Sequence, residues 1–220
     1  MLKNRLSTCM TYLKGHHVLY DIGTDHAYLP IAAVKANLIN KAYAVDNKIG
    51  PLKRAAYNIK LNDLDHVITP VLSSGIEALT EDVDVILMAG LGGNLMYNVF
   101  HDQSIKNVKR LVLQPNNHHE SVRKLTLEGY KIIDETVVTE EGIHYIIIVL
   151  EKGTANYSEK EMLFGPYLLK KKEAAYKELL TNEQNYLKTL IDMIPHEQAK
   201  KRHIKRLKSI EEVLYEWRNN

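Results

Sequence analysis

The sequence predicts an α/β protein in which a doubly wound, mostly parallel sheet ends in an antiparallel hairpin and is followed by long helices. Five apolar segments of strand length lie between residues 17 and 115, and segments of helical periodicity separate or follow most of them. The segment 85–90, "VILMAG", is continuously apolar, as expected of a strand buried on both faces. After Gly153, Lys, Glu, Leu and Tyr dominate and glycine recurs only at Gly165.

The elements follow from this pattern in order. Residues 1–14 carry Leu2, Leu6, Met10 and Leu13 at helical spacing and predict a short helix. The predicted strands are residues 17–22, 41–46, 66–72, 82–90 and 110–115. The predicted helices are residues 27–38, 50–62, 93–102 and 118–129. Pro51 lies in the first turn of its helix, where a missing N–H costs nothing.

The last third of the chain changes character twice. Residues 130–151 predict a closing hairpin that turns at Glu141 and Gly142. Beyond it, one apolar stripe at helical spacing runs from Leu168 to Ile194 and another from Ile204 to Trp217, which predicts two long helices folded back as an antiparallel hairpin. We expect a domain of residues 1–153 and a helical arm of residues 154–220. The arm either packs or dimerises, or it grips a partner.

The composition bounds the classes of function. With 45% hydrophobic and 25% charged residues, the 220-residue chain is not of the disordered class. Cys9 is the only cysteine, which excludes an intramolecular disulfide and a metal site made of cysteines. The polar start and the lack of a long apolar run predict a soluble cytoplasmic protein with no membrane and no metal partner. The net charge is only +2, but "KKRHIKRLK", from Lys200, concentrates positive charge in the arm.

Acids and glycines stand at the carboxyl ends of three predicted strands. The first strand runs into "DIGTD", which holds Asp21, Gly23 and Asp25. The second ends at Asp46, and the fourth runs into "AGLGG", residues 89–93. In an open α/β sheet, ligands bind at this edge, where the strand order reverses. Gly23 permits a positive φ and a close approach of backbone to a ligand.

The acids indicate which cofactor fits. A pyrophosphate prefers a glycine-lined helix N-terminus without nearby anions, whereas a cofactor with a sulfonium and an ammonium group prefers carboxylates. Asp21 and the loop carbonyls suit the ammonium of S-adenosyl-L-methionine, and Asp46 can accept two hydrogen bonds from the ribose hydroxyls. The sequence therefore favours S-adenosyl-L-methionine over NAD.

Each of these features also has a purely structural interpretation. Asp25 precedes a helix and can cap it, Asp46 can form an Asx turn, and "AGLGG" can be a close-packed turn between a strand and a helix. Similarly, His26 either lines the cofactor pocket or is a structural histidine. Their joint placement at strand ends is what favours a binding site.

Four segments in this order and at this spacing, "DIGTDHAYLP", "AVDNKIGPLKRAAYNI", "MAGLGG" and "LVLQPNNHHESVRKL", resemble the bacterial tRNA (adenine-22-N1)-methyltransferase family. The resemblance covers essentially the whole chain. It implies a Rossmann-like class I methyltransferase domain, with a seven-stranded, mostly parallel sheet and a terminal antiparallel hairpin, joined to a C-terminal coiled-coil hairpin. It also implies methyl transfer from S-adenosyl-L-methionine to N1 of adenine 22 in tRNA.

The cofactor-binding residues that the resemblance implies stand at successive strand ends. They are Asp21, Gly23, Thr24, His26, Asp46, Asn47, Ser74, Gly75, Ala89, Gly90, Leu91 and Gly92. Three positions depart from the family's usual pattern. Leu91 replaces the Met of "AGMGG", and "YIII" from Tyr145 replaces "YEI". Ser74 stands where an Asp would bind the adenine amino group, so we expect weaker cofactor binding.

The chemistry of the target suggests the catalytic residues. N1 of adenine carries a lone pair and no proton, so it can attack a methyl group without a general base. Catalysis then depends on in-line positioning and on negative or dipolar groups near a ring that becomes cationic. We expect Asp25 to stabilise this charge and Tyr28 to stack on a flipped adenine. Gln114 and Asn116 are candidates to hydrogen-bond the base edge or nearby backbone.

Basic residues suggest where RNA phosphates bind. The candidates are Arg5, Lys14, Arg123, Lys200, Lys201, Arg202 and Lys205. For any single one of them, a solvated surface charge is the competing interpretation. We expect a monomer or a weak dimer. A small-molecule methyltransferase with a dimerising helical hairpin is the alternative function, and a non-catalytic nucleotide-binding scaffold is a third.

Overall fold

The computed structural model describes residues 4–79, 82–101 and 108–219. The chain forms two compact units, Met1–Leu169 and Lys170–Asn220, and each is described by itself. The sequence placed its domain boundary earlier, after residue 153. The first unit extends further because Arg123 donates hydrogen bonds to the backbone carbonyls of Met162 and Leu163, at 3.3 and 3.1 Å.

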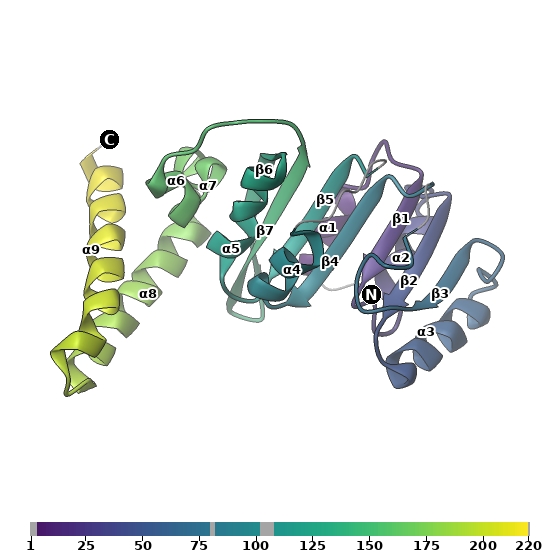
Figure 1. The fold of residues 1–220 in the computed structure, drawn as a ribbon, viewed down its shortest axis with the longest axis horizontal. Coiled ribbons are helices and arrows are strands. Elements are labelled where there is room, and N and C mark those ends of the chain that lie inside the picture. The colour runs from purple at the N-terminus through teal and green to yellow at the C-terminus, as the bar shows by residue number, and fades with distance from the viewer. Residues whose placement is uncertain (1–3, 80–81, 102–107, 220) are drawn as a thin grey trace. The chain divides into compact units, whose positions relative to one another are not determined.

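The first unit is built on a seven-stranded sheet in the order β3-β2-β1-β4-β5-β7-β6 (Figure 1). The strands are β1 (Val18–Ile22), β2 (Lys41–Asp46), β3 (Ile68–Leu72), β4 (Val85–Leu91), β5 (Arg110–Pro115), β6 (Tyr130–Glu140) and β7 (Ile143–Lys152). The first five pair in parallel, while β7 runs antiparallel to β5 and to β6. The predicted mostly parallel sheet with an antiparallel end is thus confirmed.

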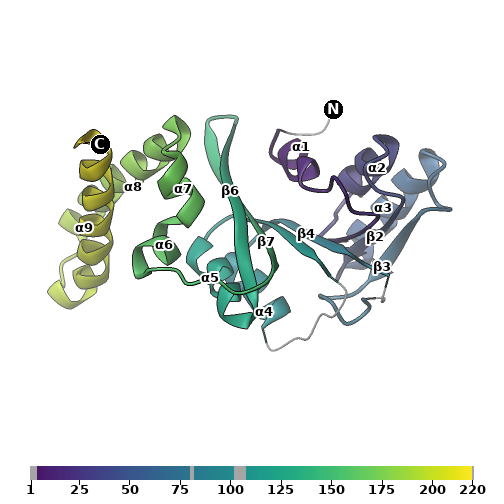
Figure 2. The ribbon, with the colours of Figure 1, turned by 90° about the horizontal axis from the view of Figure 1, so that it is seen from above.

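Helices cover both faces of this sheet. The helices before and between the strands are α1 (Asn4–Thr11), α2 (Tyr28–Lys35), α3 (Ile49–Leu61), α4 (Gly93–Phe100), α5 (His119–Arg123) and the 3₁₀ helix η1 (Lys124–Glu128), and the short helices α6 (Glu159–Phe164) and α7 (Pro166–Lys171) follow β7 in the chain. Figure 2 shows α1 and α2 on the opposite side of the sheet from α4 and α5. Cys9 and Leu13 pack with Ala33 and Ile59 into one apolar core beneath α1, α2 and α3.

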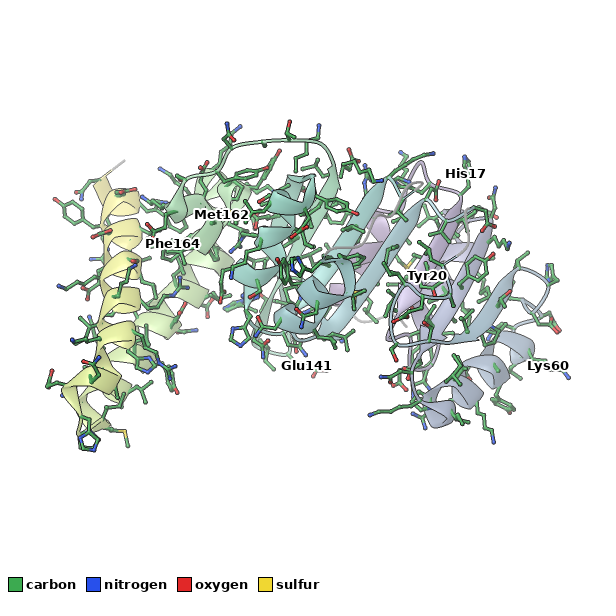
Figure 3. The ribbon with its side chains drawn as sticks, viewed as in Figure 1. His17, Tyr20, Lys60, Glu141, Met162 and Phe164 are labelled. Atoms are coloured by element: carbon green, nitrogen blue, oxygen red, sulfur yellow. The ribbon has the colours of Figure 1, made fainter. Side chains whose placement is uncertain are left out.

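The parallel strands all begin along one side of the sheet and all end along the opposite side, and these two sides are called its amino edge and its carboxyl edge. In Figure 3, His17 marks the edge where β1 begins, and Glu141, at the turn between β6 and β7, marks the opposite edge. Because β7 runs antiparallel to β5, the tip of the β6–β7 hairpin lies at the edge where β1, β2, β4 and β5 end.

Two elements differ from the sequence prediction. The single helix expected over residues 118–129 is α5 followed by η1, which ends at Gly129 with φ of +84°. The short helices α6 and α7 were not separated from the arm. Ser158 opens α6 with a capping box, in which its hydroxyl accepts from the Glu161 N–H at 3.2 Å and the Glu161 carboxylate accepts from the Ser158 N–H at 2.8 Å.

The second unit contains α8 (Ala174–Met193) and α9 (Glu197–Asn219). Arg206 of α9 makes two hydrogen bonds to Glu183 of α8, at 2.7 and 2.8 Å. Nearer the other end of the pair, the rings of Tyr176 and Trp217 lie 5.8 Å apart. Pairs that advance along α8 while they recede along α9 mean that the helices run antiparallel, as the two apolar stripes predict. Within the described ranges, no helix combines the length and apolar character needed to cross a membrane.

Candidate active site

The predicted cofactor-binding residues lie at and just beyond the carboxyl ends of β1, β2, β3 and β4. Strand order reverses between β1 and β4, since β2 and β3 follow on one side and β5 on the other. A doubly wound sheet leaves a crevice at this point because the connections on its two sides leave in opposite directions. The loops and side chains at this edge define the candidate site.

The β1 loop is tied to the neighbouring strand. The backbone N–H groups of Gly23 and Thr24 both donate to the carbonyl of Val45 in β2, at 2.9 and 3.0 Å. Gly23 has φ of +80°, and a Cβ there would lie 3.1 Å from the side chain of Leu91. Any larger residue would be strained and would push against the β4 turn, so the glycine predicted at this position is required by the geometry.

Asp21 is a buried carboxyl group with 5% of its surface exposed. Burial raises the pKa of Asp21 to about 7. The nearby hydroxyl of Thr24 opposes this increase in pKa. No basic side chain of the described ranges contributes to this shift. A buried acid without a cationic neighbour is poised to accept a cation from outside the chain.

Asp25, His26 and Ala27, which follow Thr24, form a strained turn. Asp25 and Ala27 both adopt left-handed backbone conformations, with φ of 43° and 55°. Non-glycine residues in this region are uncommon and concentrate at functional sites. Ala27, not Asp25, is the N-cap of α2, and no side chain caps this helix. The structural interpretation of Asp25 as a helix cap is therefore wrong.

The side chains of this turn point toward α3. A carboxylate oxygen of Asp25 lies 3.0 Å from the guanidinium of Arg54, and the other lies 3.4 Å from Nε2 of His26. The His26 ring stacks on Tyr28, with centroids 5.0 Å apart and planes inclined by 12°. Asn58 of α3 donates to the His26 carbonyl at 3.0 Å and so holds the turn in place. Tyr28 remains 56% exposed.

The β2 and β3 ends supply further polar groups. One carboxylate oxygen of Asp46 accepts from the Lys48 N–H at 2.8 Å, which is the Asx turn considered from the sequence, and its other oxygen makes no such turn. Asn47 and Ser74 are exposed. The buried Gly75 accepts a hydrogen bond from the Tyr20 hydroxyl at 3.3 Å through its carbonyl.

The β4 end is a bulge. The register with β5 shifts between Ala89 and Leu91, and the intervening Gly90 has φ of +79°. Gly93 opens α4 where a Cβ would lie 2.3 Å from the carbonyl oxygen of His118, so this glycine serves close packing. Ala89, Gly90, Leu91 and Gly92 are partly exposed and are available to a ligand.

Gln114 joins the ends of β4 and β5. It is fully buried, and its carbonyl oxygen accepts from Arg5 at 2.5 Å and from the Gly90 N–H at 3.1 Å. Its amide nitrogen donates to the Pro115 carbonyl at 3.1 Å. Of the two predicted roles, Gln114 shows the bond to nearby backbone, and burial excludes contact with a base edge. Asn116 is exposed and donates to the Gly90 carbonyl at 2.7 Å.

Arg5 belongs to this network. Its guanidinium lies over the Tyr145 ring, 5.2 Å from the centroid, and its Nε lies 3.5 Å from a Glu140 carboxylate oxygen. These contacts and the bond to Gln114 indicate a positioning role for Arg5 at the β4 and β5 ends, and its predicted contact with an RNA phosphate stays a prediction. Local sequence patterns could not reveal this network, because Arg5 and Gln114 are 109 residues apart.

Two other residues predicted to contact phosphates, Arg123 and Lys14, do not lie at the candidate site. Arg123 is 1% exposed and its Nε donates to Glu135 at 2.7 Å, so it belongs to the core and cannot reach a phosphate. Lys14 is exposed, but it lies in the loop that leads into the start of β1, at the edge opposite the site. In the second unit, Lys201, Arg202 and Lys205 are exposed along α9, and Lys200 pairs with Glu197 at 3.2 Å.

The donor set suits a cationic organic cofactor better than a metal ion. The buried, uncompensated Asp21 and the positive-φ glycines Gly23 and Gly90 provide a negative group beside open backbone. Among the residues with described positions, no three His, Cys, Asp or Glu side chains cluster in a way that could hold a metal. The geometry agrees with the cofactor class inferred from the sequence.

Comparisons with known proteins agree with this class of cofactor. A family model described as tRNA (adenine(22)-N(1))-methyltransferase matches residues 19–216. The Bacillus subtilis tRNA (adenine(22)-N(1))-methyltransferase is 30% identical over 219 residues, which cover 95% of this chain and 92% of that protein.

Two solved structures carry ligands. Streptococcus pneumoniae Sp1610 in complex with S-adenosyl-L-methionine has a TM-score of 0.90 and 31% identity, covering 97% of this chain and all of that one. Mycoplasma capricolum TrmK in complex with S-adenosyl-homocysteine has a TM-score of 0.88 and 26% identity, covering 97% and 98%.

Proposed function

The chain belongs to the tRNA (adenine(22)-N(1))-methyltransferase family, and we propose that it transfers a methyl group from S-adenosyl-L-methionine to N1 of adenine 22 in tRNA. The observation that carries this proposal is the buried carboxyl of Asp21 at the strand-order reversal, which no basic side chain of the described ranges offsets. An amino acid ammonium placed there supplies the missing cation.

The remaining cofactor contacts follow from the strand ends. Asp46 keeps one carboxylate oxygen outside its Asx turn, which is free to accept from a ribose hydroxyl. Ser74 and Gly75 lie at the β3 end for the adenine, and the bulge of Ala89, Gly90, Leu91 and Gly92 offers backbone to the same moiety. Thr24, His26 and Asn47 complete the wall of the site.

The chain's own residues have a limited chemical task. When bound, S-adenosyl-L-methionine supplies a methyl group on a cationic sulfur. N1 of adenine attacks with its lone pair, so the N–C bond forms as the C–S bond breaks, and no proton has to move. The protein must align the two atoms and stabilise positive charge on the base. Asp25, next to the cofactor turn, is placed for the second task.

The target base requires a surface on which to lie. Tyr28, more than half exposed and backed by the His26 ring, provides a stacking face for an adenine taken out of its helix. Asn116 presents an exposed side chain at the β5 end, where it is already oriented by Gly90. Gln114 acts through the backbone that it holds and is a positioning residue.

The arm supplies the more distant contacts with the substrate. Lys201, Arg202 and Lys205 are exposed on α9 and can bind tRNA phosphates. The protein acts in the cytoplasm, where tRNA is found, as a monomer or a weak dimer. A small-molecule methyltransferase with a dimerising arm is not favoured, because the curated relatives are named as established or putative tRNA methyltransferases.

Mass spectrometry of tRNA nucleosides from cells with and without this protein tests the proposal. Loss of 1-methyladenosine at position 22 in the deletion strain, and its return with the wild-type gene, is the expected result. A strain that returns the modification with the Asp21→Ala variant as fully as with the wild type would contradict the assigned cofactor site. An unchanged 1-methyladenosine content in the deletion strain would refute the function.

A further inference from the structure

A groove runs beside the strained turn, between the start of α2 and the exposed face of α3. Its volume is about 460 Å³, and it is lined by His26, Tyr28, Lys53, Arg54, Tyr57 and Asn58. Nothing in the cofactor site described above uses Lys53, Arg54 or Tyr57. The groove adjoins that site, because Arg54 pairs with Asp25 and Asn58 holds the His26 carbonyl.

The lining has the chemistry of a site for a single unpaired nucleotide. Lys53 and Arg54 are both exposed and cationic, which suits a phosphate. Tyr57 is 68% exposed and offers the groove a stacking face of its own, beside Tyr28, which is 56% exposed and is assigned above to the target adenine. Proteins that bind unpaired nucleic acid combine a cationic track with aromatic stacking faces in this way.

The ion pair between Arg54 and Asp25 raises a difficulty for Asp25. With its carboxylate 3.0 Å from a guanidinium, the negative charge that should stabilise a cationic adenine is largely offset. The two side chains are 52% and 57% exposed, and exposed ion pairs of this kind contribute little to stability. A competing anion can therefore separate them at small cost.

We propose that this groove binds the nucleotide next to the target adenine, and that its phosphate draws Arg54 away from Asp25. Guanidinium groups bind phosphate oxygens with two parallel hydrogen bonds, and Lys53 adds a second cation at the same place. The released Asp25 then faces the target base with its charge uncompensated. Correct seating of the RNA and activation of Asp25 become one event. This inference rests on the proposed function.

The test uses the full-length enzyme, a tRNA transcript that it methylates, and variants of the groove. Arg54→Ala and Tyr57→Ala should each raise the KM for tRNA about fivefold or more, while Tyr57→Phe, which keeps the ring, stays near wild type. Arg54→Ala should also make the logarithm of affinity about one unit less steep in the logarithm of salt concentration. Lys109→Ala, an exposed lysine at the opposite edge of the sheet, is the matched control.

The separate effects of Arg54→Ala on KM and on kcat show whether Arg54 is released from Asp25 before the reaction or must stay paired with it. If phosphate removes Arg54 before the reaction, Arg54→Ala lowers kcat much less than Asp25→Asn does. A kcat as low as that of Asp25→Asn would show that Arg54 must stay on Asp25, and would overturn the inference. So would an unchanged KM in both Arg54→Ala and Tyr57→Ala.

Two controls keep the outcomes distinguishable. Calorimetric binding of S-adenosylhomocysteine identifies variants whose fold is damaged. If Arg54→Ala no longer binds S-adenosylhomocysteine, the comparison of Tyr57→Ala with Tyr57→Phe tests whether the groove binds a nucleotide. A wild-type enzyme that methylates tRNA while every groove variant matches it refutes the groove and leaves the proposed function standing. A wild-type enzyme that methylates no tRNA refutes both.

Discussion

The guanidinium of Arg5 donates to the side-chain carbonyl of Gln114 at 2.5 Å and thereby joins α1 to the end of β5. The same Gln114 oxygen accepts from the Gly90 N–H at 3.1 Å. Helix α1 therefore holds the bulge that shapes the site, through one buried amide. Removal of Arg5 leaves Gln114 with one fewer donor and Gly90 less restrained.

Arg5→Ala should lower kcat more than it weakens tRNA binding, because the contacts of Arg5 in the structure position the Gly90 bulge through Gln114. A loss of about tenfold is expected for a misplaced site. Single-turnover kinetics and tRNA binding, with the exposed Ser7→Ala of the same helix as control, provide the measurement. A large loss of tRNA affinity with unchanged kcat would restore Arg5 as a phosphate contact.

Asp21 should make the cofactor-free protein less stable as the pH rises. Its folded pKa of about 7 exceeds its ordinary 3.8, so the protonated form is favoured on folding. This stabilising effect is complete below pH 3.8 and is lost as the pH rises through 7. Relative to Asp21→Asn, the free energy of unfolding of the wild type should fall by about 4 kcal/mol over this range. Urea unfolding of both proteins measures it, and parallel pH profiles would contradict the assignment.

The same residue predicts the pH dependence of cofactor binding. The ammonium group should bind the ionised Asp21, so affinity for S-adenosylhomocysteine weakens as the pH falls below 7. Calorimetry should show this trend in the wild type and a weak, pH-independent affinity in Asp21→Asn. Equal affinities for the two proteins at high pH would place the ammonium elsewhere.

Asp25→Asn should reduce kcat by about tenfold or more, since it removes a charge near the cationic base and keeps the shape of the side chain. Cofactor affinity should change little, because the Asp25 carboxylate contacts Arg54 of α3 and His26, while the predicted ammonium contact is Asp21. Methyl transfer at saturating tRNA and cofactor is the measurement. Activity within a few-fold of wild type would eliminate the charge role.

Arg123 should be a stability residue and not an RNA contact. Its Nε donates to Glu135 at 2.7 Å in the core, and the Tyr167 N–H donates to the same carboxylate at 3.1 Å. Arg123→Ala leaves a buried carboxylate without its charge partner and should lower the free energy of unfolding by about 3–5 kcal/mol. Chemical denaturation measures this. The double variant Arg123→Met with Glu135→Leu should recover stability, and a soluble, stable Arg123→Ala with weak tRNA binding would reverse the conclusion.

The arm should contribute affinity and not chemistry. Changing Lys200, Lys201, Arg202 and Lys205 to Ala together should raise the KM for tRNA and flatten its salt dependence by about one unit per lost phosphate contact. The kcat at saturating tRNA should hold, because these residues lie on α9, in the second unit. Unchanged tRNA affinity at low and high salt would show that the arm has another role.

Local patterns were sufficient to predict most of the fold. Strand and helix positions follow from periodicity within each segment, and the hairpin at Glu141 and Gly142 follows from its turn residues, both with positive φ. The sequence predicts one helix over residues 118–129, where the structure has α5 and η1, because a 3₁₀ turn has nearly the same spacing of apolar residues as an α-helix. Strand ends also placed Asp21, Asp46 and Gly90 at one edge, since parallel strands end together.

Partners that are distant in the sequence could not be predicted. The burial of Arg123 depends on β6 and on α6. The sequence prediction places α6 in the helical arm, outside the domain that contains Arg123. The approach of Arg54 to Asp25 depends on the packing of α3 beside α2, across 29 residues. Lys14 is different, because a residue that precedes the first strand must lie at the amino edge of the sheet, and the topology alone excludes it from the site.

Methyl transfer by the purified protein to a tRNA transcript, with labelled S-adenosyl-L-methionine, tests the proposed function most directly. If the target is N1 of adenine 22, label is found in 1-methyladenosine, primer extension is blocked once, at position 22, and both signals are lost when adenine 22 is replaced by guanine. Label on an exocyclic amine, at another position, or equally in the substituted transcript would contradict it.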